Sequence, residues 1–168
     1  MSQRKAWQAI VASGDRHGIV FEDDILFGRD SAEIFADFSW MPQDIHLLRL
    51  ETVLRHTVHD AKPITTILNR DIVRLRHVLL GAGAYIISAH AAAHLLEITA
   101  KFTYACDYVL FDPTCDDFCC FDVFQMVPAI CIQSAVAKKP DLPSILGPMR
   151  KEMFYKGRVR FIQNLSVN

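Results

Sequence analysis

The sequence predicts an α/β fold, because segments typical of strands alternate with segments typical of helices. The runs "GIVF" at 18–21 and "AYIIS" at 84–88 are short, apolar and contain β-branched residues, as buried strands do. The alanine-rich run "AHAAAHLLEITAK" at 89–101 has the composition and length of a helix instead. With 168 residues, 51% of them hydrophobic and 22% charged, the chain is long enough to bury one core.

A helix is expected first, over residues 2–13. Ser2 can cap its N-terminus, alanine and isoleucine side chains recur along one face, and Gly14 follows as a stop signal. The short strand at 18–21 comes next.

A second helix and three further strands are expected before residue 80. Asp30 and Glu33 have the spacing of a capping box, which predicts a short helix through residues 32–38. The run "DIHLLRLE" at 44–51 reads as one strand. Two more short strands are predicted within 64–78, around a turn at Asn69-Arg70.

The second half is expected to contain the strand at 84–88 and a helix that begins near Ser88. The stretch 106–120 mixes acids, aromatic residues and cysteines, and we interpret it as a loop or short helix with a turn at Asp112-Pro113. The run at 123–133 is typical of a strand but contains Pro128, which indicates an edge strand or a bend.

The domain is expected to span residues 1–137, followed by a basic tail at 138–168 that contains proline and glycine. A basic and aromatic tail of this kind can rest on an anionic membrane surface. A solvated helix is the simpler interpretation of the same segment. The basic residues concerned are Arg150, Lys151, Lys156, Arg158 and Arg160.

Several classes of protein are disfavoured by composition. The net charge is −1, so no overall field would recruit nucleic acid. The N-terminus lacks the apolar core of a signal peptide, which favours a cytoplasmic protein, with peripheral contact at the inner membrane through the tail.

The uncharged window 78–96 approaches the length of a membrane span, but its glycines, serine and histidines favour a strand followed by a helix. The five cysteines lack the spacing of a zinc site and are expected to be reduced.

Three consecutive acids, Glu22, Asp23 and Asp24, follow the strand at 18–21. Ligands of open α/β sheets collect beyond the carboxyl ends of strands, and carboxylates there can hold a hard divalent cation that is shared with a phosphate. If the strand continues, Glu22 and Asp24 share one face and form the metal pair, and Asp23 faces a sugar hydroxyl or the backbone. The alternative interpretation is an acidic turn exposed to solvent.

This acidic stretch, "IVFEDDILF", is accompanied by other motifs. "MSQRKAW" at 1–7 precedes it, and "GAGAYIISAHAAAHLLE" at 81–97, "DYVLF" at 107–111 and "VFQMVPAICIQ" at 123–133 follow it. In order and spacing they resemble the motifs of glycosyltransferase family 25, the bacterial lipooligosaccharide biosynthesis enzymes. Gln3 stands where that family usually has histidine. The resemblance covers about residues 1–135.

The resemblance implies a GT-A-like (Rossmann-like) mixed sheet flanked by helices. It also implies a UDP-sugar donor, usually UDP-galactose or UDP-glucose, and transfer of the hexose to a lipooligosaccharide acceptor with inversion, assisted by Mn²⁺ or Mg²⁺. In this family pattern Glu22 and Asp24 match metal-binding positions, and Asp23 and Asp24 match positions that hold the diphosphate.

The resemblance also assigns roles elsewhere in the chain. Asp107 matches an acid that could act as general base or hold the acceptor, and a helix-end acid is an equally good interpretation of it. Tyr85 and Gln133 match motif positions with a structural role. The nearby acids that compete with Asp107 are Asp112, Asp116 and Asp117.

Members of this family usually carry a further segment before the helix with which this chain begins. We therefore expect an N-terminally truncated domain, which lacks much of the uridine-binding wall and exposes a sheet edge that favours homo-oligomers. The alternative is a catalytically inactive remnant that acts as a self-associating or partner-binding module. An unrelated metal-dependent hydrolase or phosphotransferase is disfavoured by the ordered motifs.

Four histidines are further candidates for metal binding. His90 and His94 are four residues apart on a predicted helix and could share a face. No Glu lies beside His90 to complete a zinc-protease motif, so surface or packing roles are favoured. His56 and His59 are expected in a loop.

Overall fold

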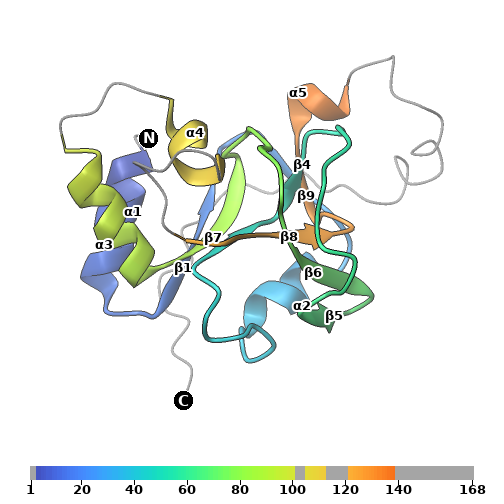
Figure 1. The fold of residues 1–168 in the computed structure, drawn as a ribbon, viewed down its shortest axis with the longest axis horizontal. Coiled ribbons are helices and arrows are strands. Elements are labelled where there is room, and N and C mark those ends of the chain that lie inside the picture. Colours follow the sequence, from blue (N-terminus) through green and yellow to red (C-terminus); the bar gives the residue numbers. More distant parts are fainter. Residues whose placement is uncertain (1–2, 101–104, 113–120, 139–168) are drawn as a thin grey trace.

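The structure is a computed structural model that describes residues 3–100, 105–112 and 121–138 (Figure 1). Its described part contains a six-stranded mixed sheet with strand order β1-β7-β3-β8-β6-β5 and a three-stranded sheet with order β2-β9-β4. The predicted α/β fold, with a mixed sheet flanked by helices, is therefore confirmed.

The larger sheet consists of β1 (His17–Phe21), β3 (Leu47–Arg49), β5 (Thr65–Ile67), β6 (Arg70–Arg74), β7 (Ala84–Ser88) and β8 (Val123–Val127). The smaller sheet consists of β2 (Ile25–Phe27), β4 (Glu51–Thr52) and β9 (Cys131–Gln133). The helices are α1 (Gln3–Ser13), α2 (Ser31–Ala36), α3 (Ala89–Ile98), α4 (Cys106–Phe111) and α5 (Ser134–Ala137).

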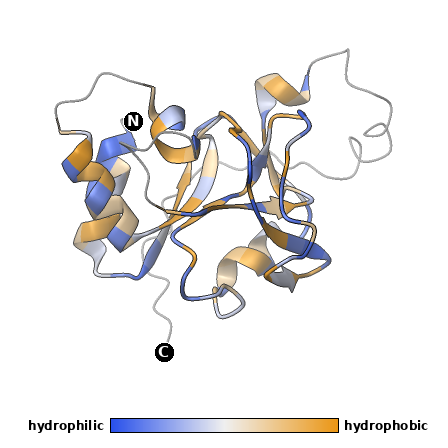
Figure 2. Ribbon diagram, viewed as in Figure 1, coloured by the Kyte–Doolittle hydropathy of each residue, from blue (hydrophilic) through white to orange (hydrophobic). Residues whose placement is uncertain are grey.

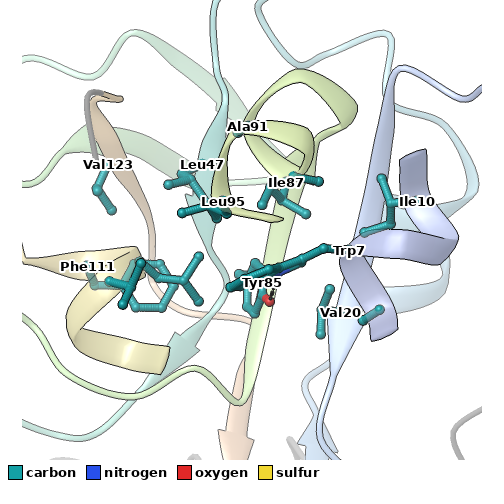
Figure 3. Packing of buried hydrophobic residues seen from close by; sticks show 14 of the residues in the cluster. Trp7, Ile10, Val20, Leu47, Tyr85, Ile87, Ala91, Leu95, Phe111 and Val123 are labelled. Atoms are coloured by element: carbon teal, nitrogen blue, oxygen red, sulfur yellow. Dashed lines mark hydrogen bonds between the residues drawn. The ribbon is translucent and has the colours of Figure 1, made fainter. Parts of the chain in front are cut away.

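Helices α1 and α3 lie side by side on one face of the larger sheet (Figure 1). Both helices carry hydrophobic and hydrophilic residues along their length (Figure 2), and they turn apolar side chains toward the sheet. Trp7 from α1, Leu95 from α3 and Phe111 from α4 pack with Leu47 and Ile87 of the strands (Figure 3). This layer forms the first of two core clusters.

The second core cluster lies on the opposite face of the sheet. Ile34 and Phe35 of α2 pack there with Leu48 of β3, Ile86 of β7 and Ile25 of the smaller sheet. Leu47 and Leu48 thus contribute to opposite faces of the sheet, and both are fully buried. Burial on both faces explains why these strands read as continuous apolar runs in the sequence.

Tyr85 is the polar centre of the first core cluster. Its side chain is fully buried, and its hydroxyl accepts a hydrogen bond of 2.8 Å from Trp7 Nε1. The same hydroxyl donates to Gln3 Oε1 at 2.7 Å. These bonds tie β7 to α1, so Tyr85 is built into the packing between helix and sheet.

The predicted strand at 44–51 is divided between the two sheets at Leu50. β3 ends at Arg49 and β4 begins at Glu51. The Leu50 amide donates to the Ala84 carbonyl of β7, whereas the Leu50 carbonyl accepts from the Ile130 and Cys131 amides beside β9. One strand was predicted because the hydrophobic pattern continues through this point. The structure shows that the chain changes partners there.

Helix α3 begins after Ser88, near which its start was predicted, and Ser88 Oγ caps it by accepting a hydrogen bond of 3.0 Å from the Ala91 amide. The helix expected at 32–38 forms as α2, but the capping box that predicted it is wrong. Asp30 occupies the cap position with φ +68°, and its side chain makes no capping bond. Cap residues typically have extended backbone, which Asp30 does not adopt.

The β5–β6 hairpin was placed one residue too late. Its two turn residues are Leu68 and Asn69, both with positive φ, and Ile67 pairs with Arg70. Leucine is an unfavourable residue for this conformation, so a turn at Leu68 could not be predicted from residue preferences.

The chain bends at Pro128, as one of the two interpretations predicted. β8 lies between β3 and β6, so the other interpretation, an edge strand, is wrong. β2 and α5 were not predicted, because three or four residues carry too little periodicity to be recognised.

The window 78–96 forms strand β7 and most of helix α3, as expected. Among the described residues, no helix has the length and apolar character needed to cross a membrane. Some of the residues named in the sequence analysis lie outside the described part of the chain. These are the expected cap Ser2, the acids Asp116 and Asp117, and the tail from residue 139 onward.

Histidines gather at the end of the sheet where β1 begins and β7 ends. His46 Nδ1 lies 2.9 Å from Ser88 Oγ, and the His46 ring neighbours His90 and Phe121. His17 Nε2 lies 3.0 Å from the Ile45 carbonyl. Burial lowers the pKa of His17, and burial followed by the charge of His90 lowers the pKa of His46.

Replacing Tyr85 with phenylalanine is expected to lower the free energy of unfolding by about 1–3 kcal/mol, because the buried Trp7 indole N–H loses its acceptor. Urea denaturation followed by fluorescence measures this change. Tyr108→Phe is the matched control, since that side chain is 47% exposed, and it should change stability by less than about 0.5 kcal/mol. Equal effects of the two substitutions would contradict the assigned role of Tyr85.

Acidification is expected to destabilise the protein through His17 and His46. Their pKa values are lower in the folded state than the ordinary value of about 6.5, so the unfolded chain binds more protons. The stability they contribute is complete above about pH 6.5 and is lost as the pH falls through the folded-state values. Urea denaturation at pH 7.5 and pH 5 should show a smaller loss for His46→Gln than for the wild type. The exposed His56→Gln should lose as much as the wild type. A His46→Gln protein with unchanged pH dependence would refute this explanation.

Candidate active site

The three acids lie on a tight turn between β1 and β2. The Ile25 amide donates to the Glu22 carbonyl at 3.3 Å, which closes the turn. The expected continuation of the strand past Phe21 is therefore wrong, and strand alternation does not set these side chains. Glu22 and Asp24 are nonetheless both half-buried, whereas Asp23 is exposed.

Neighbouring segments hold this acidic turn in place from two sides. The Glu22 amide donates to the Gly83 carbonyl at 2.8 Å, just before β7. Gln133 Nε2 donates to Glu22 Oε2 at 2.8 Å, and the Ser134 amide donates to the Asp24 carbonyl at 2.9 Å. Within the described residues, no Lys or Arg forms an ion pair with these acids. The turn thus presents carboxylates that are positioned but not neutralised.

A buried ion pair lies behind the acidic turn. The side chains of Arg49 and Glu51 are both fully buried, and Arg49 Nη2 lies 3.4 Å from Glu51 Oε1. Arg49 also donates to the carbonyls of Gly81 and Leu80 and to Gln125 Oε1, at 3.1–3.3 Å. Sequence analysis missed both residues. The available signal was a pair of opposite charges, two residues apart, inside the apolar run "LLRLE".

Glu51 connects this pair to the backbone beside the turn. Its Oε1 accepts a hydrogen bond of 2.7 Å from the Gly83 amide, whereas its Oε2 is buried without a partner. Burial is the main cause that raises the pKa of Glu51, and the negative charge of Glu22 adds to it. Glu51 and Glu22 are therefore close enough to interact electrostatically.

Asp107 lies in the first turn of α4, half-buried, with Oδ1 accepting a hydrogen bond of 3.1 Å from the Tyr108 amide. The Arg49 guanidinium lies over the Phe111 ring of the same helix, 5.6 Å from its centroid. Burial, followed by the charges of Asp107 and Glu22, raises the pKa of Cys106 to about 12. The structure therefore brings Asp107 and Glu22, which are distant in sequence, around one end of the sheet.

The donor set at this end fits a hard cation, because it consists of carboxylate oxygens. Within residues 3–100, 105–112 and 121–138, no group of three or more His, Cys, Asp or Glu side chains is arranged to hold a metal ion. Two carboxylates suffice where phosphate oxygens and water complete the shell, as Mg²⁺ sites commonly do. His90 is not part of this end, because it lies with His46 at the opposite end of the sheet.

The sequence model of glycosyltransferase family 25 (LPS biosynthesis protein) matches residues 1–110. The chain belongs to glycosyltransferase family 25. This confirms the resemblance found in the sequence motifs. In the three-dimensional structure, the matched region contains the acidic turn, the buried ion pair and Asp107.

Curated proteins of lipooligosaccharide and lacto-N-neotetraose biosynthesis are similar to most of the chain. The lipooligosaccharide biosynthesis protein lic2B of Haemophilus influenzae is 26% identical over 151 residues, which are 84% of this chain and 55% of the relative. The lacto-N-neotetraose biosynthesis glycosyltransferase LgtE of Neisseria meningitidis serogroup B is 28% identical over 79% of this chain and 50% of its own length. LgtB of Neisseria meningitidis serogroup A is 28% identical over 89% of this chain and 57% of its own length. The chain spans about half the length of the curated relatives it matches.

Proposed function

We propose that this chain takes part in transferring a hexose from a UDP-sugar, UDP-galactose or UDP-glucose, to a lipooligosaccharide acceptor. The observation that carries the proposal is the acidic turn, which holds two half-buried carboxylates at the same end of the sheet as Asp107. Membership of family 25 supports the reaction class, and the names of the relatives support the acceptor. A GT-A-like fold is part of the proposal, supported by a mixed sheet whose strand β1 leads into the acidic turn.

Glu22 and Asp24 are the residues that would hold Mn²⁺ or Mg²⁺. Such an ion, when bound, offsets the negative charge that develops on the departing diphosphate. Gln133 fixes one oxygen of Glu22 and leaves the other without a hydrogen bond among the described residues. Asp23 is exposed beside them and can accept a hydrogen bond from a hydroxyl of the donor.

Asp107 is proposed as the general base. It would take the proton from the acceptor hydroxyl as the oxygen attacks the anomeric carbon and the bond to the diphosphate breaks. Attack from the face opposite the leaving group inverts the configuration at that carbon. The buried positive charge of Arg49 is close enough to Asp107 for the two side chains to interact electrostatically.

Isothermal titration calorimetry with Mn²⁺ and UDP tests the ligands of the acidic turn. The wild type is expected to bind UDP in a Mn²⁺-dependent manner, and Glu22→Gln and Asp24→Asn should each weaken binding at least about tenfold, because each removes a charged oxygen ligand. Asp44→Asn is the control, since Asp44 is an exposed acid beside the histidines at the opposite end. A wild type that binds neither ligand would instead support an inactive module that binds a protein partner.

Steady-state transfer from UDP-galactose or UDP-glucose to a lipooligosaccharide acceptor tests Asp107. Asp107→Asn is expected to lower kcat by about 10²–10⁴-fold with little change in the KM for the donor, as loss of a general base does. Asp112→Asn, at the other end of α4, should retain most of the activity. Activity that is lost in Asp112→Asn and retained in Asp107→Asn would indicate that Asp112 is the general base.

A further inference from the structure

Glu51 contacts the backbone that supports the acidic turn more closely than it contacts its ion-pair partner. The bond from the Gly83 amide to Glu51 Oε1 is 2.7 Å, whereas Arg49 Nη2 is 3.4 Å from the same oxygen. Arg49 has acceptors in two backbone carbonyls and in Gln125. Three of the five N–H donors of Arg49 therefore have acceptors other than Glu51, and the shortest hydrogen bond of Glu51 is the one from Gly83.

The second oxygen of Glu51 fills the space that a side chain at position 83 would need. A Cβ placed on Gly83 would lie 2.8 Å from Glu51 Oε2, 3.0 Å from Ile25 Cδ1 and 3.1 Å from Gln133 Cγ. The space in front of Gly83 is thus bordered by Glu51, by the start of β2 and by the side chain that binds Glu22. Glu51 Oε2 is buried and has no hydrogen-bond partner in the described part of the chain, and a buried polar atom left in this state is costly.

A continuous series of contacts leads from Glu51 to Glu22. Glu51 holds the Gly83 amide, and the Gly83 carbonyl accepts the hydrogen bond of the Glu22 amide at 2.8 Å. The other support of Glu22 is the hydrogen bond from Gln133 Nε2 to Glu22 Oε2, and the Gln133 side chain borders Gly83 as well. Glu51 therefore acts on Glu22 through the backbone of Gly83.

We propose that Glu51 is a positioning residue, which fixes the backbone of Gly83 and thereby sets the place of Glu22 and its carboxylate. The effect of Glu51 on metal binding rests on the proposed function. Its effect on the position of Glu22 does not. A carboxylate that supports a ligand in this way commonly affects metal affinity by about 10–100-fold without touching the ion.

Amide hydrogen exchange measured by NMR tests the positioning without any ligand. In Glu51→Leu the Glu22 amide should exchange at least about tenfold faster than in the wild type, because local opening no longer has to break the Glu51–Gly83 bond. Glu51→Gln keeps an oxygen that can accept the Gly83 amide, so it should stay within about threefold of the wild type. Ile72→Ala is the control for a general loss of stability, since Ile72 is fully buried in β6, away from these contacts.

Gly83→Ala is the second variant, and it decides the question if Glu51→Leu does not fold. It keeps both charges of the ion pair, but its Cβ displaces Glu51 Oε2. It should also accelerate exchange at Glu22. Unchanged exchange at Glu22 in the variant that folds, or acceleration no greater than in Ile72→Ala, would overturn the proposal.

Calorimetry with Mn²⁺ and UDP then measures the consequence for binding. Glu51→Leu should bind about 10–100-fold more weakly than the wild type, and Glu51→Gln should recover most of this loss. Binding that is equally weak in Ile72→Ala would count against positioning. If the wild type binds neither ligand, the proposed function fails, and the exchange experiment alone still decides the role of Glu51.

Discussion

The buried ion pair between Arg49 and Glu51 is the constraint on which the arrangement of the two sheets depends. Both side chains are fully removed from water, so each charge must find partners inside the protein. Arg49 ends β3 of the larger sheet and Glu51 begins β4 of the smaller sheet. Their partners are the segment 80–83, which leads into β7, and Gln125 of β8, and these two strands flank β3. The pair therefore determines how the sheets join at the end that carries the acidic turn.

The two ends of the larger sheet have different chemical characters. β1 begins at His17 beside His46 and His90, where burial lowers the pKa of the first two. β1 finishes at the acidic turn, where carboxylates are half-buried and no described Lys or Arg pairs with them. In the proposed function, the acidic end is where a sugar nucleotide and its metal would bind. The chain spans about half of its curated relatives, so the complete nucleotide site is part of the proposal.

The sequence analysis succeeded where local signals and tertiary structure agree. The strand at 84–88 and the helix that begins near Ser88 were predicted from an apolar run followed by an alanine-rich segment, and both are present. It failed where a long-range contact decides the local structure. The division at Leu50 depends on bonds to β7 and β9, which no local pattern encodes. Arg49 and Glu51 were overlooked for the same reason, because only the folded structure shows that their charges are buried and paired.

The most direct test of the central claim is paramagnetic broadening of backbone amide NMR signals by Mn²⁺ in the presence of UDP. If the acidic turn holds the ion, the amides of Glu22, Asp23 and Asp24 should broaden first, followed by that of Gly83. The signals of His46 and His90, at the opposite end of the sheet, should remain sharp at the same Mn²⁺ concentration. Broadening centred on those histidines, or no selective broadening at all, would contradict the account.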